Sequence, residues 1–181
     1  MRTTTARIGS AGALLSLLSV AAPAQDRVAP EGAWIGLEAG YASGSCGWCS
    51  SSARAPSGSI VVAGAVTERL GVGAEWNVWA NSTDQISSAS AVVYVFPDAE
   101  AGFVFQGGLG FSKVPSRARG LAALAGVSYH TRLGPNFLLA PSAHLRYSVA
   151  GRRLNPRRPD GRSSFVVLDV GLGLIVSFGR L

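Results

Sequence analysis

Two serine–histidine pairs are the residues of this chain whose types and spacing could carry out chemistry. Ser128 lies two positions before His130, and Ser142 lies two positions before His144. On an extended strand this spacing puts both side chains on one face, and a carboxylate such as Asp169 would complete a set of serine, base and orienting acid. Each pair could therefore belong to a hydrolase. We favour the alternative, a structural histidine held by hydrogen bonds. The strand pattern described below predicts that these side chains point into the interior of the protein.

A second candidate for chemistry is the sequence Cys46-Gly47-Trp48-Cys49. Two cysteines at this spacing can exchange disulfides when one thiol is acidic, but that activity usually needs a thioredoxin-like strand and helix, and no such pattern surrounds them. We predict a small disulfide between Cys46 and Cys49 that closes a loop in an oxidising compartment. Zinc is disfavoured because two thiolates fill half of a four-ligand structural site. We predict no metal and no cofactor.

The elements that position these residues are predicted from alternating hydrophobicity. Within 165–178, apolar residues occupy every second position from Val166 to Phe178, and most positions between them are polar or glycine. Such alternation indicates a strand, and its length suits the ~9–11 or more residues of a tilted transmembrane strand. Similar segments recur at 33–43, 59–66, 69–80, 88–96, 102–112, 118–131, 136–149 and 163–179. We therefore predict an all-β fold, an eight-stranded antiparallel up-and-down transmembrane β-barrel whose short turns and both termini lie in the periplasm.

The N-terminus indicates export. Arg2 and Arg7 precede an apolar run over 11–22, and residues 22–24 have the small-x-small form that signal peptidase cleaves. The apolar run is shorter than the ~20 residues of a spanning helix. Three regions are expected: a cleaved signal peptide at 1–24, a short periplasmic segment at 25–32 and an outer-membrane barrel at 33–181.

Composition agrees with a membrane-embedded barrel. The chain is 48% hydrophobic and 14% charged, whereas a soluble domain commonly has about a quarter charged residues. Its formal net charge of +6 is modest, and the export signal conflicts with a role in binding nucleic acid. We therefore expect the bacterial outer membrane as its location and no nucleic-acid partner.

The predicted inward face carries polar side chains among glycine, alanine and serine. The interior of an eight-stranded barrel is only wide enough for side chains to fill, and buried charges need partners, so we predict a paired network and not an open pore. If the last hairpin is symmetric about its loop, His144 lies opposite Asp169. The predicted network comprises Glu38, Glu75, Gln106, His130, Arg132, His144, Arg146 and Asp169.

Two strands have irregular patterns, and aromatic residues indicate the membrane interfaces. Pro141 lies within the seventh strand and predicts a bulge. In the fourth strand we take Val92, Tyr94 and Phe96 to point outward, which leaves Val93 and Val95 inward, and the opposite register is the open alternative. The predicted outward aromatics are Tyr41, Trp76, Phe111 and Tyr147 near the loop ends, and Phe103, Tyr129, Phe137 and Phe178 near the periplasmic ends.

An export signal, eight alternating strands, short turns and a charged, filled interior resemble the OmpA/OmpX class of small outer-membrane barrels. The resemblance implies a monomer that contacts outer-membrane lipid and is inserted by the barrel-assembly machinery. Such barrels commonly end in an aromatic residue that this machinery reads. Here Gly179, Arg180 and Leu181 follow Phe178, so either Phe178 is a slightly internal signal or Leu181 replaces it.

The loop at 151–162 carries the strongest run of charge. Arginines pair well with phosphates, so this loop could contact lipopolysaccharide phosphates or another anionic lipid, and a solvated loop without a partner is the open alternative. Its arginines are Arg152, Arg153, Arg157, Arg158 and Arg162. The sequence as a whole favours a non-enzymatic outer-membrane barrel that serves envelope integrity or surface interaction. A lipid A-modifying enzyme and a narrow channel are the alternatives.

Overall fold

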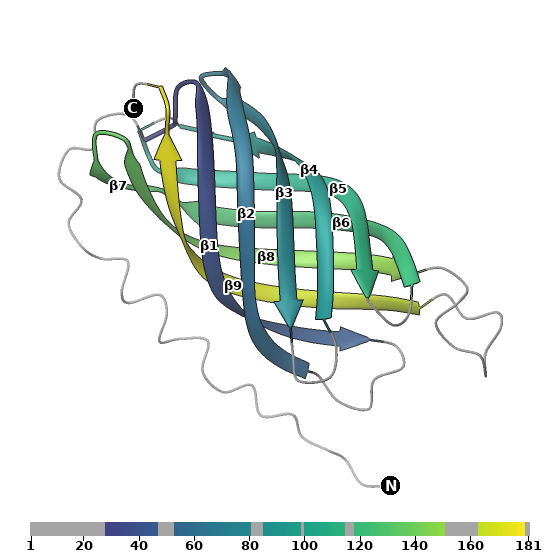
Figure 1. Cartoon of the computed structure of the whole chain (residues 1–181). Helices are drawn as coiled ribbons and strands as arrows, with labels where there is room; N and C mark the ends of the chain where they lie inside the picture. Colours follow the sequence, from purple (N-terminus) through teal and green to yellow (C-terminus); the bar gives the residue numbers. More distant parts are fainter. Residues whose placement is uncertain are drawn as a thin grey trace, which may run out of the picture.

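The described part of the chain is a closed β-barrel (Figure 1). The computed structural model describes residues 28–46, 53–80, 85–98, 100–114, 118–150 and 163–179. The predicted signal peptide, residues 25–27 of the predicted periplasmic segment, Cys49 and the loop 151–162 lie outside these residues. Among the residues described, no helix has the length and apolar character needed to cross a membrane.

Eight strand positions surround the lumen. The strands are β1 (Ala33–Cys46), β2 (Ala53–Thr67), β3 (Leu70–Ala80), β4 (Gln85–Val95), β5 (Phe103–Val114), β6 (Ala118–Tyr129), β7 (Thr131–Gly134), β8 (Phe137–Ala150) and β9 (Ser163–Ser177). Sequence neighbours pair antiparallel from β1 to β6, β9 lies between β1 and β8, and the pairing of β6 with β8 closes the sheet. Because β7 continues the line of β6 along β8, the predicted eight-stranded antiparallel barrel is confirmed.

The strands extend further toward the external end than alternation indicated. β1 continues to Cys46 and β2 begins at Ala53, although we expected a loop across 44–58. Alanine, serine, proline and glycine dominate this region, so hydrophobic alternation could not reveal a strand there. Backbone pairing forms it nevertheless, and Gly44 pairs with Ala53.

Pro141 does not produce the predicted bulge. β8 pairs with β9 in one unshifted register on both sides of Pro141. On its other edge the pairs Ser128↔Ser142 and Thr131↔Leu139 also share one register, so no residue is inserted. Proline lacks the N–H that the ladder would use, and its position coincides with the gap that divides β6 from β7.

The fourth strand has the second of the two orientations left open by the sequence, and the one taken first is wrong. Val92, Tyr94 and Phe96 are buried inside the barrel, whereas Val93 and Val95 are exposed. Both faces of this strand are apolar, so alternation could not distinguish them. The pairing with β3 distinguishes the two faces. Ser90 pairs with the inward Glu75. Tyr94 pairs with Gly71, which also faces inward, since an added Cβ there would collide with the Trp34 ring.

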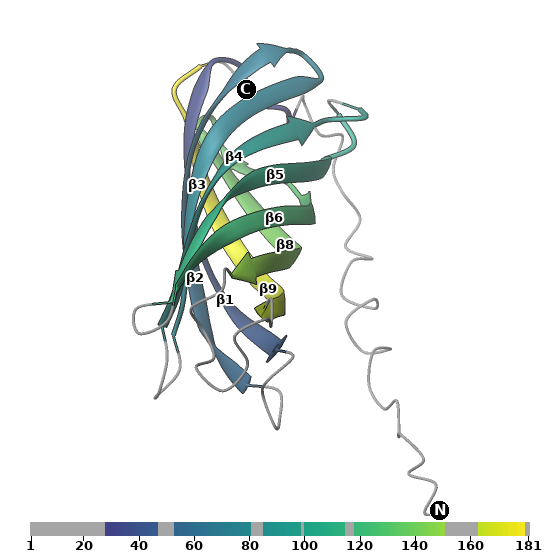
Figure 2. The ribbon, with the colours of Figure 1, turned by 90° about the vertical axis from the view of Figure 1, so that its right-hand side faces the viewer.

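Figure 2 shows β3, β4, β5 and β6 side by side in the barrel wall. The outer surface of the barrel is apolar along its length and has aromatic side chains near both ends. The predicted outward positions of seven of the eight aromatics are confirmed, and Tyr129 is half-buried. Many aliphatic side chains between them are also exposed: Leu37, Ile60, Val72, Leu109, Leu121, Leu145, Leu168, Leu172 and Leu174. Such a surface suits lipid, and the aromatic rows suit the two interfaces.

Candidate functional site

The lumen is filled in three layers. An apolar layer at the end that carries the termini contains the edge-on pairs Trp34–Tyr94 and Trp34–Phe96, with ring centroids 5.6 and 6.3 Å apart. A smaller apolar layer nearer the external end contains Trp79, Phe165 and Val167. Charged and polar side chains from β1, β3, β5, β8 and β9 lie between these two layers.

Arg146 joins two acids on different sides of the polar layer. Its Nη1 donates to Glu75 Oε1 at 2.5 Å, and its Nη2 lies 3.9 Å from Asp169 Oδ2. All three residues are buried, with exposed fractions of 7%, 4% and 2% for Arg146, Glu75 and Asp169. β8 therefore places one guanidinium between β3 and β9, where charge-assisted bonds are strong.

His144 occupies the neighbouring position in the same layer. Its Nδ1 lies 3.4 Å from Glu38 Oε1, and its Nε2 contacts Gln106 Nε2. The predicted register of His144 opposite Asp169 is confirmed, although the ion-pair contact is with Glu38. Gly126 is needed beside these residues because an added Cβ would collide with the imidazole of His144.

Two serines complete the acid contacts. Ser142 Oγ donates to Glu38 Oε1 at 2.6 Å, and Ser57 Oγ donates to Asp169 Oδ1 at 2.7 Å. Sequence reasoning did not include Ser57, because β2 was expected to begin after it. Its position two residues before Ser59 on the inward face is the signal that a longer strand would have provided.

Glu38, His144 and Asp169 are also the described residues whose arrangement could hold a cation. Their donor atoms lie within 4.8 Å of one another. Glu38 and Asp169 already accept the serine hydroxyls described above, and Arg146 supplies positive charge beside Asp169. The two acids thus each have a hydroxyl donor, whereas His144 Nδ1, Arg146 Nε and Arg146 Nη2 have no hydrogen-bond partner among the described residues.

His130 and Arg132 lie apart from this network, near the periplasmic end. Ser128 Oγ lies 3.2 Å from His130 Nε2, and the imidazole packs edge-on against Phe96. No described residue accepts a hydrogen bond from His130 Nδ1, so the acid of a catalytic set is missing there. Arg132, on β7, donates from Nε to Gly134 O at 3.4 Å. Among the described residues, Ser128 thus contacts a histidine that has no acid partner, and Ser142 donates to an acid, Glu38. Neither arrangement is that of a serine, a base and an orienting acid in sequence.

Free space in the lumen is small. A cavity of about 40 Å³ lies beside Glu38, Tyr94 and His144, and a second of about 20 Å³ lies beside Arg146 and Trp79. One water needs roughly 10–15 Å³ of such volume. Each of these two spaces has room for only a few waters.

The remaining predicted site residues belong to the segments that follow β1 and β8 in the sequence. Cys49 and the five loop arginines lie outside the described residues, so the disulfide and the anionic-lipid contact stay predictions. Arg54 and Lys113 are described and exposed near this end.

Comparisons with known proteins identify the fold. No family model and no curated protein sequence matches the chain. Neisserial surface protein A is similar in structure, with a TM-score of 0.61 at 18% identity over 82% of this chain and 98% of that one. Ail, the attachment invasion locus protein of Yersinia pestis, has a TM-score of 0.53 at 16% identity over 80% and 99% of the two chains. Ail in complex with the heparin analogue sucrose octasulfate has a TM-score of 0.51 at 14% identity, again over 80% and 99%.

The fold is thus that of the small eight-stranded outer-membrane barrels, of the OmpA/OmpX-like kind. Its apolar belt, its aromatic rows and its filled polar lumen are the features that such a barrel needs in lipid. The chain accordingly has the fold and the apolar outer surface of an integral outer-membrane β-barrel.

Proposed function

We propose that this barrel is a non-enzymatic surface protein that acts through its external end by binding anionic groups, and so contributes to surface interaction or envelope integrity. One observation carries the proposal: the buried Arg146–Glu75–Asp169 arrangement and the two apolar layers fill the lumen. A filled lumen neither transports nor admits a substrate, so function is assigned to the outside.

The external end has the chemistry for an anionic partner. The loop 151–162 contains five arginines and one aspartate, and arginine pairs bidentately with phosphate and sulfate-like groups. Ail, which shares the fold, has been solved with a sulfated saccharide analogue. We therefore propose anionic saccharides and lipopolysaccharide phosphates as the ligand class. The protein would act as a monomer inserted by the barrel-assembly machinery.

Titration of the purified full barrel with sucrose octasulfate tests this function. We expect measurable binding by calorimetry that weakens as salt rises, because exposed charges are screened. Replacement of the five loop arginines by glutamine should weaken binding at least tenfold, whereas Lys113→Gln should leave it nearly unchanged. Equal binding by the wild type and the variant that lacks all five loop arginines would contradict the proposal that the loop binds the anionic ligand.

Lipid A hydrolysis is the second candidate, and the 3.2 Å contact between Ser128 and His130 is the observation in its favour. Both residues are buried in the lumen, where an acyl chain in the membrane does not reach them. Mass spectrometry of lipid A from cells with and without the protein should show identical species. A change in lipid A that His130→Ala or His144→Ala abolishes would overturn the non-enzymatic assignment.

A further inference from the structure

A hollow on the lipid-facing side of the barrel combines apolar walls with a cation. This flank hollow has a volume of about 720 Å³ and is lined by Trp76, Ser87, Ala89, Phe111, Lys113 and Leu121. It lies on β3 to β6, close to the strand ends at the external side. Its lining stands on the outside of the barrel, apart from the lumen, and includes no residue of the loop 151–162.

The strand register explains why the surface is hollowed here. Trp76 pairs with Ala89, Ala89 with Phe111, and Phe111 with Leu121. A small alanine thus stands in one outward row between a tryptophan and a phenylalanine, and the large side chains form walls on both sides of it. Trp76, Phe111 and Leu121 are exposed, so the walls are available to an apolar chain from the membrane.

Lys113 gives the hollow a polar end. It stands in the next outward row toward the external side, paired with Ser87 on β4 and with Arg119 on β6. Within the described part of the chain, Lys113 has no acidic partner. An anion at the level of the lipid headgroups would complete this arrangement.

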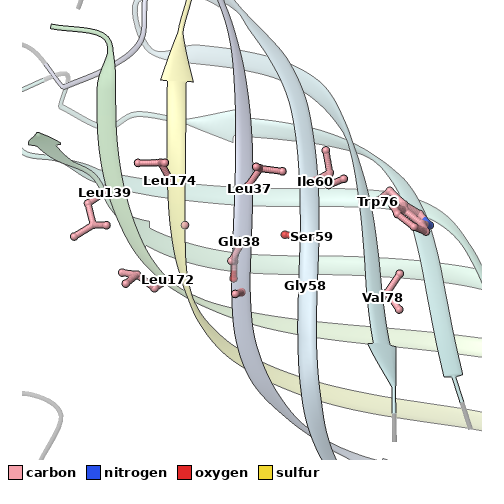
Figure 3. A pocket seen from close by; sticks show the side chains of 12 residues that line it. Leu37, Glu38, Gly58, Ser59, Ile60, Trp76, Val78, Leu139, Leu172 and Leu174 are labelled. Carbon is pink, nitrogen blue, oxygen red and sulfur yellow. The ribbon is translucent and has the colours of Figure 1, made fainter. Parts of the chain in front are cut away.

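A neighbouring hollow provides the contrast. It is about 500 Å³ in volume and lies on the other side of Trp76, where Leu37, Ile60 and Leu174 stand in a row above Gly58 and Leu172 (Figure 3). Its lining includes Ala39 on the outward face and no cation. The two hollows therefore share apolar character and one wall, and they differ in Lys113.

We propose that the flank hollow is a binding site for a phosphate-bearing lipid of the outer leaflet, with an acyl chain against Ala89 between Trp76 and Phe111 and the phosphate on Lys113. The site goes beyond the binding of anionic groups by the loop arginines proposed above, because it lies on the side of the barrel, uses different residues and includes an apolar groove for an acyl chain. It would hold one lipid in a fixed place beside β4.

Tryptophan quenching by brominated acyl chains tests the site in the full chain. In a Trp48→Phe background, Trp76 is the lipid-facing tryptophan, since Trp34 and Trp79 are buried in the lumen. The protein is reconstituted in phosphatidylcholine vesicles that contain increasing fractions of brominated phosphatidic acid or of brominated phosphatidylcholine. A lysine near a charged lipid surface is worth about fivefold in binding, so we expect the phosphatidic acid to compete about fivefold better for Trp76.

Two pairs of variants identify the determinants. Lys113→Gln should reduce this preference to about one, and Ala89→Leu, which fills the hollow, should reduce quenching by both lipids. The matched controls Arg54→Gln and Ala39→Leu should retain the wild-type preference. Equal competition by the two lipids in the wild type, or an equal loss with Arg54→Gln, would overturn the proposal. Lys113→Gln changes an exposed side chain and so tests the site even if Ala89→Leu fails to fold.

Discussion

Replacing Arg146 with methionine should destabilise the barrel strongly, because it leaves two buried carboxylates without their guanidinium. Arg146 contacts Glu75 at 2.5 Å and lies 3.9 Å from Asp169, and all three are at least nine-tenths buried. Removal of one partner from a buried ion pair typically costs about 3–5 kcal/mol. Methionine keeps most of the side-chain length, so the loss would come from charge and not from a large cavity.

Reversible urea unfolding in lipid vesicles, followed by tryptophan fluorescence, measures this free energy by linear extrapolation. Arg54→Met is the matched control: Arg54 is exposed, and exposed charges contribute about 0–1 kcal/mol. Combining Glu75→Gln with Arg146→Met should recover part of the loss, since one of the two unpaired acids is then neutral. If Arg146→Met stays within about 1 kcal/mol of the wild type, the polar layer does not stabilise the barrel as we describe.

Three further predictions follow from the layers and the register. Trp34→Ala should cost about 3–5 kcal/mol of unfolding free energy, measured by the same urea titration, whereas Trp76→Ala should cost less because lipid replaces its contacts. A cysteine at Val93 should react with a membrane-soluble maleimide in intact vesicles and a cysteine at Val92 should be protected, and the reverse result would restore the other register of β4. Planar bilayers with the wild-type protein should show no stable single-channel conductance, since the lumen holds spaces of about 40 and 20 Å³; a steady conductance that rises with Arg146→Ala would contradict a filled lumen.

The sequence predicts this barrel wherever the two faces of a strand differ. The segment from Val166 to Phe178 alternates cleanly, and its predicted orientation agrees with the exposed Leu168 and the buried Asp169. The orientation of β4 could not be predicted, because both of its faces are apolar: Val92 and Tyr94 lie on one, Val93 and Val95 on the other. Its pairing with β3 sets the orientation.

The contacts of the polar layer were only partly predictable. Symmetry of the last hairpin correctly placed His144 opposite Asp169, because a hairpin register is a local property. The contact of His144 with Glu38, and that of Arg146 with Glu75, cross between strands far apart in sequence. Those distances depend on strand tilt and stagger, which the order of residues along one strand does not reveal.

The polar layer also joins the first strands of the barrel, β1 to β3, to the last two, β8 and β9. Glu38 accepts a hydrogen bond from Ser142, Asp169 accepts one from Ser57, and Glu75 accepts one from Arg146, across sequence separations of 104, 112 and 71 residues. During synthesis and insertion, the acids of β1 and β3 exist before the base of β8 is in place. They would remain hydrated in an open sheet, and they would lose that water only when the last strands complete the circle. Ion pairing would then be the final step of barrel closure. The residues that fill the finished lumen would form their ion pairs only after every strand is in place.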